Sequence, residues 1–382
     1  MLDGRLSAQT GRLRRPFFIL SPPSTTPLLA TPLRDAHESL GGKLVDFAGW
    51  EMPLDYGSIL GESQAVRDKA GVFDVSHMAR FSFTGAKAQK ELDHALGARM
   101  SDLPVGKARY SLLLAEDGGI LDDLIVYRTT EESFFVVVNA SNRIRDWETL
   151  TARLSATEAA DITLDGGGIL ALQGPQAKTI LSQIIKTEDF CPEFLDLAYL
   201  RKTPFGNLFL ARTGYTGEHG YEIFTAPGQT KDIWNALLEA GALPAGLGSR
   251  DVLRLEAGLP LYGHEIHETV TPFEAGLGFG VMGWKHRTFV GSDALPHVHP
   301  PKRKLIGFLG EKRVPREGYR VLSDGIEVGV ICSGAWSATL DKPIATALVQ
   351  ENCNGPWAVD IRGKETPVHI TNLPFVPHRS RD

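Results

Sequence analysis

The chain has 382 residues, more than one hydrophobic core usually supports, so its length predicts two or three domains. A hydrophobic share of 42% and a charged share of 23% are typical of a globular protein. The net charge of −6 argues against a general nucleic-acid binder, which would carry a basic face. No apolar run reaches the ~20 residues of a membrane-spanning helix, so no membrane partner is expected.

The cysteines are few and widely separated. Cys191, Cys332 and Cys353 make no CxxC pair, which argues against a disulfide framework and against a thiolate zinc site. This pattern favours a reducing compartment. We therefore expect a cytoplasmic protein that contains no metal.

Residues 1–30 differ in composition from the rest of the chain. They are rich in Ser, Thr and Pro, and four basic residues, Arg5, Arg12, Arg14 and Arg15, oppose a single acid. This composition fits an organelle-targeting extension, which would place the protein in the mitochondrial matrix. A disordered arm or an upstream start codon explains the segment equally well.

The first elements of the body follow from the spacing of apolar residues. Helices are expected at 35–40, 58–70 and 86–99, and an alternating strand at 71–85. A meander of three strands is expected at 108–115, 119–127 and 133–140. Ser141 is expected to be the N-cap of a helix over 143–154, since its hydroxyl can accept from a first-turn N–H.

The later elements include a strand, a Gly-Pro turn and a helix over 169–185, and a hairpin over 208–226. Helices are expected at 229–240 and 248–258. The Pro-rich segment 297–304 is interpreted as a solvated linker, and the chain beyond it as a small barrel or sandwich. These elements predict an α+β body at 31–296 and a C-terminal β domain at 297–382.

Two adjacent carboxylates lie inside the apolar string GGILDDLIVY, residues 118–127. Because successive side chains of a strand point to opposite faces, Asp122 and Asp123 cannot form a face-to-face acid–base pair. Asp123 shares its face with Tyr127, and Asp122 lies on the other face. We expect one of the two in a functional cavity and the other in a structural or solvated position.

The string RTGYTGEHGYE, residues 212–222, combines three glycines with Tyr215 and Glu222. Its backbone could approach a ligand closely, and a carboxylate could accept two parallel hydrogen bonds from a guanidine-like edge such as that of a pterin. The spacing alone favours a simpler explanation, a Gly-rich hairpin with an exposed tyrosine. Arg250, at a helix start, could bind an anion or pair with Asp251 or Glu256.

Two further motifs carry less weight. GHEIHE, residues 263–268, holds His264 and His267 beside two glutamates, but no third ligand is clustered with them, so a metal site is not favoured. GLGFG, residues 276–280, is not a GxGxxG motif and follows no clear strand, so it is interpreted as a loop.

The chain as a whole resembles the T-protein family of the glycine cleavage system. The resemblance runs from about residue 31 to 377, and the strings that carry it occur in the family's order. They are DFAGWEMPLDYGSI (46–59), GVFDVSHM (71–78), KARYS (107–111), GGILDDLIVY (118–127), VVVNASN (136–142), LQGPQA (172–177), RTGYTGEHGYEI (212–223), PAGLGSRDVLRLEAGLPLYGHEI (244–266) and TPFEAGL (271–277). The resemblance implies three domains around a central channel, the last of them a β-barrel.

The resemblance also implies an activity. Family members are aminomethyltransferases that move the one-carbon unit from the aminomethyl-lipoyl group of the H-protein to tetrahydrofolate. Ammonia is released, and the products are 5,10-methylenetetrahydrofolate and dihydrolipoyl H-protein. Tetrahydrofolate is thus implied as co-substrate and lipoylated H-protein as partner.

The family's functional residues map onto this chain one by one. The catalytic aspartate is the second of the Asp pair, Asp123. The positions that contact folate are Tyr110, Tyr127, Asn139, Tyr199, Tyr215, Glu222 and Arg250. Because a free aspartate has a pKa of ~3.9, we expect Asp123 to orient a folate nitrogen and favour developing positive charge rather than to remove a proton outright.

The chain departs from the family at two places. Many relatives end with an aromatic residue where this chain has Ser380, so Arg379 or Arg381 would have to replace that folate contact. Leu259 stands where some relatives carry a tyrosine. Two alternative functions remain: a folate-dependent demethylase of a small methylated substrate, from the same superfamily, and, in a different class, a non-enzymatic folate-binding assembly factor, whose KGCYxGQE segment is absent here.

Overall fold

The computed structural model describes residues 27–191 and 193–380. Most of the expected N-terminal extension therefore lies outside the described residues. Its last two residues, Leu29 and Ala30, form strand β1 and pair in parallel with Trp50 and Glu51. Strand β1 thus includes two residues that were assigned to the extension.

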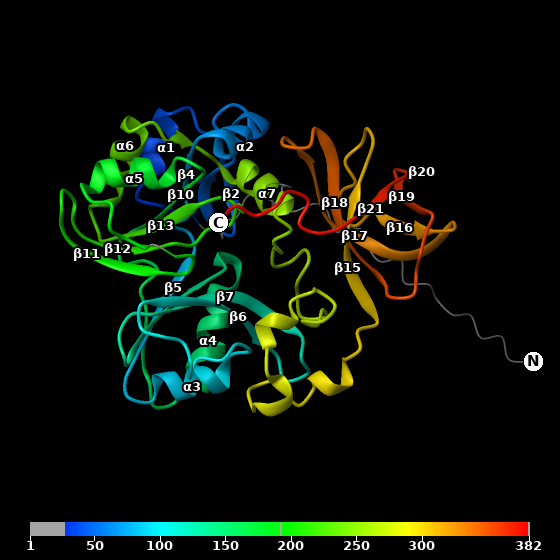
Figure 1. The fold of residues 1–382 in the computed structure, drawn as a ribbon, viewed down its shortest axis with the longest axis horizontal. Coiled ribbons are helices and arrows are strands. Elements are labelled where there is room, and N and C mark those ends of the chain that lie inside the picture. Colours follow the sequence, from blue (N-terminus) through cyan, green and yellow to red (C-terminus); the bar gives the residue numbers. More distant parts are fainter. Residues whose placement is uncertain (1–26, 192, 381–382) are drawn as a thin grey trace, which may run out of the picture.

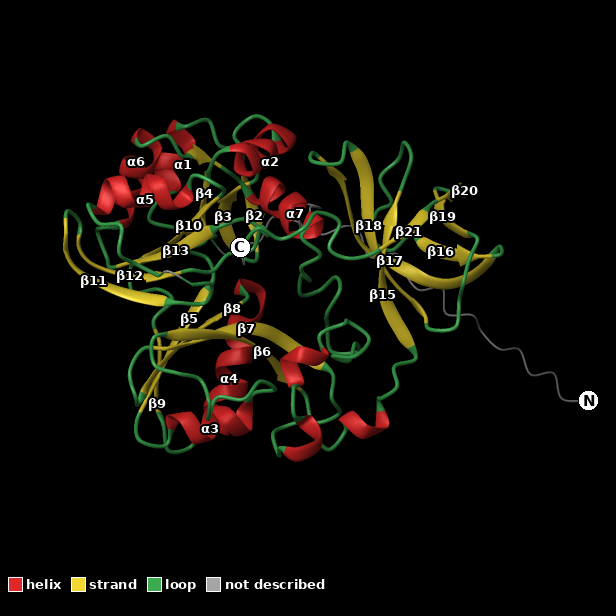
Figure 2. Ribbon diagram, in the orientation of Figure 1, coloured by secondary structure: helices red, strands yellow, loops and turns green. Residues whose placement is uncertain are grey.

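The first part of the chain forms four layers, helix–sheet–sheet–helix, seen from top to bottom in the left half of Figures 1 and 2. The first sheet has the order β11-β12-β13-β10-β4-β14. Its strands are β4 (Gly71–Asp74), β10 (Gly168–Gln173), β11 (Leu197–Thr203), β12 (Gly206–Ala211), β13 (Gly220–Thr225) and β14 (Leu243–Pro244). Three helices cover its outer face: α1 (Arg34–Ser39), α5 (Ala177–Ile185) and α6 (Thr230–Glu239).

The second sheet packs against the face of the first sheet that α1, α5 and α6 leave uncovered. Its order is β6-β7-β8-β5-β9. The strands are β5 (Ala79–Thr84), β6 (Lys107–Leu114), β7 (Ile120–Arg128), β8 (Ser133–Val138) and β9 (Glu158–Asp161), and the helices on the outer face are α3 (Ala88–Ala95) and α4 (Arg143–Arg153). The expected α+β class and three-strand meander are confirmed.

A smaller sheet and two helices lie beside these layers. They are β1 (Leu29–Ala30), β2 (Leu44–Phe47), β3 (Trp50–Pro53), α2 (Ile59–Asp68) and α7 (Leu247–Glu256). An irregular segment follows α7 and contains the 3-10 turns η2 (Gly278–Val281), η3 (Trp284–His286) and η4 (Leu295–His297); a further turn, η1 (Ala140–Asn142), precedes α4.

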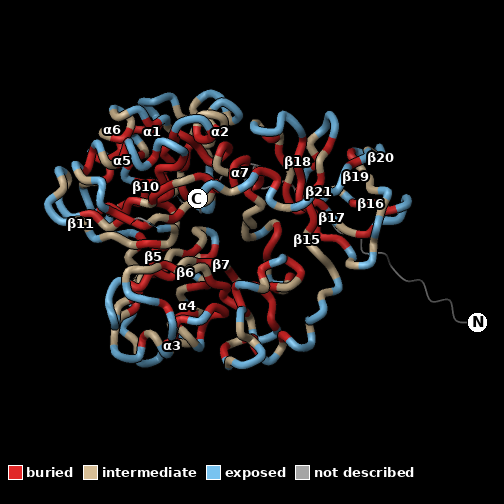
Figure 3. Tube along the Cα trace, viewed as in Figure 1, coloured by how far each residue is buried: buried red, intermediate tan, exposed pale blue. Residues whose placement is uncertain are grey.

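The C-terminal part is a curled sheet of order β20-β19-β16-β17-β18-β15-β21, at the right of Figure 1. Its strands are β15 (Arg303–Leu309), β16 (Arg320–Ser323), β17 (Ile326–Ser337), β18 (Lys342–Gln350), β19 (Trp357–Ile361), β20 (Lys364–Pro367) and β21 (His369–Thr371). Figure 3 shows the buried trace concentrated in the strands of both parts, with exposed residues in the connecting loops.

Three local expectations were wrong. The alternating run 71–85 is two strands in different sheets, because the chain turns at Val75–Met78 and Asp74 receives the backbone N–H of Ser76. Helix α4 is preceded by η1 and has Asn142, not Ser141, at its N-cap. The predicted solvated linker ends in β15, where Arg303 binds Glu274.

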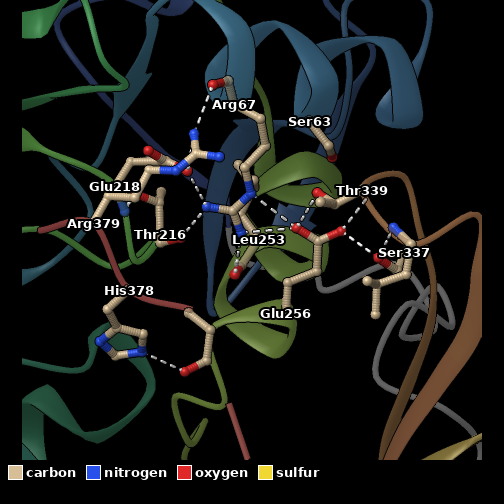
Figure 4. A network of polar contacts seen from close by, with 12 residues as sticks. Ser63, Arg67, Thr216, Glu218, Leu253, Glu256, Ser337, Thr339, His378 and Arg379 are labelled. Atoms are coloured by element: carbon tan, nitrogen blue, oxygen red, sulfur yellow. Dashed lines mark hydrogen bonds and ion pairs between the residues drawn. The ribbon is translucent and has the colours of Figure 1, made fainter. Parts of the chain in front are cut away.

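A buried ion cluster joins the separate parts of the fold, as Figure 4 shows. Arg67 of α2 donates from Nη1 to Glu218 Oε1 (2.8 Å) and from Nη2 to Glu256 Oε2 (2.8 Å). Glu256, at the end of α7, also accepts from Ser337 Oγ (2.6 Å) and from the backbone N–H of Thr339 (3.1 Å). One guanidinium therefore links α2, the β12–β13 connection, α7 and the C-terminal sheet.

The cluster predicts that Glu256→Gln lowers the free energy of unfolding by about 2–5 kcal/mol. Arg67, Ser337 and Thr339 all donate toward this carboxylate, so an amide NH₂ in its place would face donors. Urea denaturation measures the effect, with Glu239→Gln on the exposed side of α6 as control. Equal stability of the two variants would contradict the cluster's structural role.

Candidate active site

A cavity of about 1020 Å³ lies where the two stacked sheets meet α7 and the segment after it. Its volume is at the upper end of the range common for small-molecule sites. Seven of the residues implied by the family resemblance line this cavity: Tyr110, Asp123, Tyr127, Asn139, Tyr215, Glu222 and Arg250. They come from β6, β7, β13, α7 and the connections after β8 and β12, so folding brings together positions far apart in sequence.

Tyr199 does not join this group. It lies on β11, at the edge of the first sheet, where its side chain is 59% exposed and the guanidinium of Arg201 stands over its ring. At the C-terminal tail, Arg379 turns toward Arg67 and Glu218, while His378 lines the cavity and contacts the carbonyl oxygen of Ala257. Arg381 lies outside the described residues.

The Asp pair is divided as strand geometry predicted. Asp123 points into the cavity, where it accepts from Tyr110 Oη (3.1 Å) and from Asn139 Nδ2 (2.9 Å). Asp122 is fully buried on the opposite side of β7 and accepts from Asn139 Nδ2 (2.8 Å) and Asn142 Nδ2 (2.7 Å). The single Asn139 amide thus bridges the two carboxylates.

The surroundings change the acidity of Asp123. Burial, and then the nearby Asp122 carboxylate, raise the pKa of Asp123 to about 7, although hydrogen bonds from Asn139 and Tyr110 act in the opposite direction. Burial also raises the pKa of Tyr110, which therefore remains a neutral donor. Asp123 can consequently hold or release a proton near neutral pH, which its ordinary acidity would not allow.

Glu222 lines the cavity from β13. The hydroxyl of Tyr127 donates to Glu222 Oε2 (3.2 Å), and Thr213 Oγ1 donates to the same oxygen. Both of these bonds end on Oε2; no hydrogen bond from the described residues ends on Oε1, so that oxygen could accept from a donor on a ligand. Ala211 pairs directly with Glu222, and Thr213 lies two residues further along the chain. This two-residue spacing places the Thr213 hydroxyl on the same side as the Glu222 carboxylate.

Arg250 carries a positive charge in the cavity wall. Its guanidinium lies over the Tyr215 ring at 4.7 Å, and its Nη1 is buried without a hydrogen-bond partner in the described structure. The pairings considered from sequence do not form, because Asp251 receives Arg254 and Glu256 receives Arg67. Burial lowers the pKa of Arg250, although the nearby Tyr215 and the charge of Glu222 act in the opposite direction.

His77 adds a neutral group to the same wall. It is 2% exposed, and its Nδ1 has no hydrogen-bond partner among the described residues. Burial lowers the pKa of His77 to about 4, so the ring is uncharged at neutral pH. Sequence reasoning overlooked His77 within GVFDVSHM because alternation alone does not show which residues of a turn face a cavity.

Gly214, in the β12–β13 connection, and Gly220, at the start of β13, leave room for a side chain of the protein itself. A Cβ at Gly214 or Gly220 would stand 2.0–2.2 Å from side-chain atoms of Gln173. Gln173 is buried, donates to the carbonyl oxygen of Thr213 and accepts from Thr216 Oγ1. The small residues are therefore needed to house this glutamine, which in turn shapes the connection beside Glu222.

The GHEIHE segment is occupied by protein contacts. Glu265 binds Arg254 (2.8 Å) and Thr346, and Glu268 binds Arg145 (2.7 Å). In the ranges that the structure describes, no group of three or more His, Cys, Asp or Glu side chains could hold a metal ion. Over the same ranges, none of the helices is both long and apolar enough to cross a membrane.

Comparisons with known proteins place these features in one context. Residues 33–285 match the family model described as the GCVT N-terminal domain, and residues 303–377 match the glycine cleavage T-protein C-terminal barrel domain. An aminomethyltransferase of Saccharopolyspora erythraea is 44% identical over 358 residues, covering 90% of this chain and 97% of the relative. One from Thermus thermophilus is 43% identical over 352 residues, covering 91% and 99%.

A solved structure agrees with these sequence matches. The crystal structure of glycine cleavage system aminomethyltransferase T from Bartonella henselae superposes with a TM-score of 0.85 at 34% identity. The superposition covers 92% of this chain and 99% of that one. The expected fold, with its C-terminal barrel, is confirmed.

The raised pKa of Asp123 predicts a change of stability with pH. In the folded state the pKa rises from its ordinary 3.8 to about 7, so folding favours the protonated carboxyl. Asp123 therefore costs stability progressively as pH rises through this interval. The free energy of unfolding of Asp123→Asn should exceed that of the wild type increasingly from pH 5 to about pH 7, and the difference should then level off.

Urea denaturation at several pH values measures this difference. Asp232→Asn, an exposed position at the start of α6, is the control, and its difference from the wild type should not change over the same range. A constant difference for Asp123→Asn would show that the buried carboxylate is not penalised.

Proposed function

The chain belongs to the glycine cleavage T-protein family of aminomethyltransferases, and we propose that its cavity transfers the one-carbon unit from aminomethyl-lipoyl H-protein to tetrahydrofolate. Ammonia leaves, and the products are 5,10-methylenetetrahydrofolate and dihydrolipoyl H-protein. The observation that carries this proposal is the convergence of Asp123, Glu222 and Arg250 in one cavity. No observation favours a demethylase or a non-enzymatic assembly factor.

The proposed binding mode follows from the chemistry of tetrahydrofolate. Its pterin edge carries neighbouring N–H donors, which Glu222 would accept through Oε1 while Tyr127 and Thr213 hold Oε2. The rings of Tyr110 and Tyr215 offer surfaces for the aromatic parts of the substrate. Arg250, with one buried nitrogen unpartnered, would serve a carbonyl or carboxylate group.

Asp123 is proposed to act on a reacting folate nitrogen. Its carboxylate, fixed by Tyr110 and Asn139, would orient that nitrogen and stabilise the positive charge that develops during transfer. Because its pKa is about 7, it can also exchange a proton with the substrate near neutral pH. Much of the acceleration would come from holding the thioaminal carbon beside the nitrogen.

Other expectations remain proposals. We propose that residues 31–296 form the folate-binding body and 297–382 the barrel domain, and that lipoylated H-protein docks where its arm can enter the cavity. We further propose a cytoplasmic location, supported by cysteines that are scattered and free.

Asp123→Ala should lower kcat for aminomethyl transfer by at least about 100-fold while tetrahydrofolate binding weakens only slightly. Asp122→Ala should retain more activity, because that carboxylate lies outside the cavity. A purified assay with aminomethylated H-protein and tetrahydrofolate compares the variants. Equal losses at both positions would refute the assigned role of Asp123.

Glu222→Gln should weaken tetrahydrofolate affinity by roughly 1–3 kcal/mol, the cost of a lost charge-assisted contact. Calorimetric titration of the purified variant measures this affinity, with the exposed Glu239→Gln as control. Unchanged affinity in Glu222→Gln would remove this carboxylate from the pterin site.

A further inference from the structure

A third carboxyl group lies behind the Asp pair. Asp146, on the buried side of α4, is 0% exposed, and it lies close enough to Asp122 for the charge of Asp122 to act on it. Neither of its oxygens accepts a hydrogen bond from any N–H or hydroxyl of the described residues. A fully buried carboxylate without a donor is costly, so this group requires an explanation.

An ion pair with Arg145 does not supply that explanation. Arg145 Nε is 3.6 Å from Asp146 Oδ1, too far for a hydrogen bond, and Nε itself lacks a partner. The other guanidinium nitrogens are engaged: Nη1 with Glu268 (2.7 Å) and Tyr262 Oη (3.0 Å), and Nη2 with the carbonyl oxygen of Leu121.

Asp122, in contrast, is well supplied with donors. Its Oδ1 accepts from Asn139 Nδ2 and Asn142 Nδ2, and its Oδ2 accepts from the backbone N–H of Asn139 (3.1 Å). These bonds stabilise a negative charge on Asp122. Two carboxyl groups close together and away from water cannot both be ionised, so the one without donors takes the proton.

We propose that Asp146 is a positioning residue which, as the neutral acid, donates a hydrogen bond to Asp122 and thereby holds the Asn139 amide that donates to Asp123. The proposal rests on the proposed role of Asp123 in transfer. A raised pKa of Asp146, caused first by burial and then by the charge of Asp122, agrees with it. The proton on Asp146 thus keeps the negative charge of the Asp122–Asp146 pair on Asp122.

The charged and titratable groups around the cluster come from four segments. They are Asp122 and Asp123 on β7, Tyr110 on β6, Arg145 on α4, and Tyr262 and Glu268 in the segment after α7. Among these, Asp122 raises the pKa of Asp123 through its charge. Loss of the donor at Asp146 would loosen Asn139, whose hydrogen bond lowers the pKa of Asp123, so the pKa of Asp123 would rise.

The test compares two substitutions that differ in one property. Asp146→Asn keeps a donor toward Asp122 without a titratable proton, whereas Asp146→Leu has similar volume and no donor. We expect Asp146→Asn to keep kcat within about threefold of the wild type, and Asp146→Leu to lose about 10- to 100-fold in kcat with little change in KM for tetrahydrofolate. Glu148→Gln, exposed on the same helix, is the matched control.

The pH profile supplies a readout that a loss of folding would not produce. The acid limb of kcat should move to higher pH in Asp146→Leu and stay in place in Asp146→Asn. The pH dependence of the unfolding free energy should shift in the same way, and it does not require activity. Equal impairment of both variants would favour an ionised Asp146 paired with Arg145 and overturn the proposal, as would wild-type behaviour of Asp146→Leu.

Infrared difference spectroscopy tests the proton directly in the intact protein at neutral pH. The wild type should show a protonated carboxyl band that is missing from Asp146→Asn and present in Glu148→Gln. Absence of this difference overturns the proposal, even if Asp146→Leu fails to fold. Absence of transfer activity in the wild type would instead refute the proposed function. The infrared spectra and the pH dependence of stability would still show whether Asp146 carries the proton.

Discussion

The buried guanidinium of Arg67 is the contact on which the arrangement of the cavity depends. A buried cation needs close counterions, and Arg67 takes them from two segments, Glu218 in the β12–β13 connection and Glu256 at the end of α7 (Figure 4). The first segment leads to Glu222, and the second carries Arg250. An ion cluster outside the cavity therefore joins the two segments that position these groups.

Strand β7 separates two neighbouring carboxylates by pointing them to opposite faces. Its two-residue repeat places Asp122 among amide donors and Asp123 in the cavity, although the two are neighbours in sequence. The same side-chain types thus acquire different chemistry from their surroundings, and Asn139 keeps them in contact. Such pairs of titratable groups with divergent environments are a recurring basis for acid–base chemistry in proteins.

The parts predicted well from the sequence are those governed by local rules. The alternation of side chains along a strand predicted that Asp122 and Asp123 lie on opposite faces. The sequence strings that resemble the family predicted seven residues that line one cavity. The partners of Arg250 could not be predicted, because the nearby acids Asp251 and Glu256 are taken by Arg254 and Arg67, the latter far away in sequence. The position of Asp146 beside Asp122 could not be predicted either, since the two residues belong to different elements.

The C-terminal tail has a consequence for the order of events during folding. After the last strand of the curled sheet, the backbone of Val376 bonds to Glu256 and that of Arg379 bonds to Gly217, which places Pro374 and His378 in the cavity wall. Both partners of the tail lie far earlier in the chain, at the end of α7 and in the β12–β13 connection. The cavity wall is therefore complete only when the C-terminal sheet and the first part of the chain have come together.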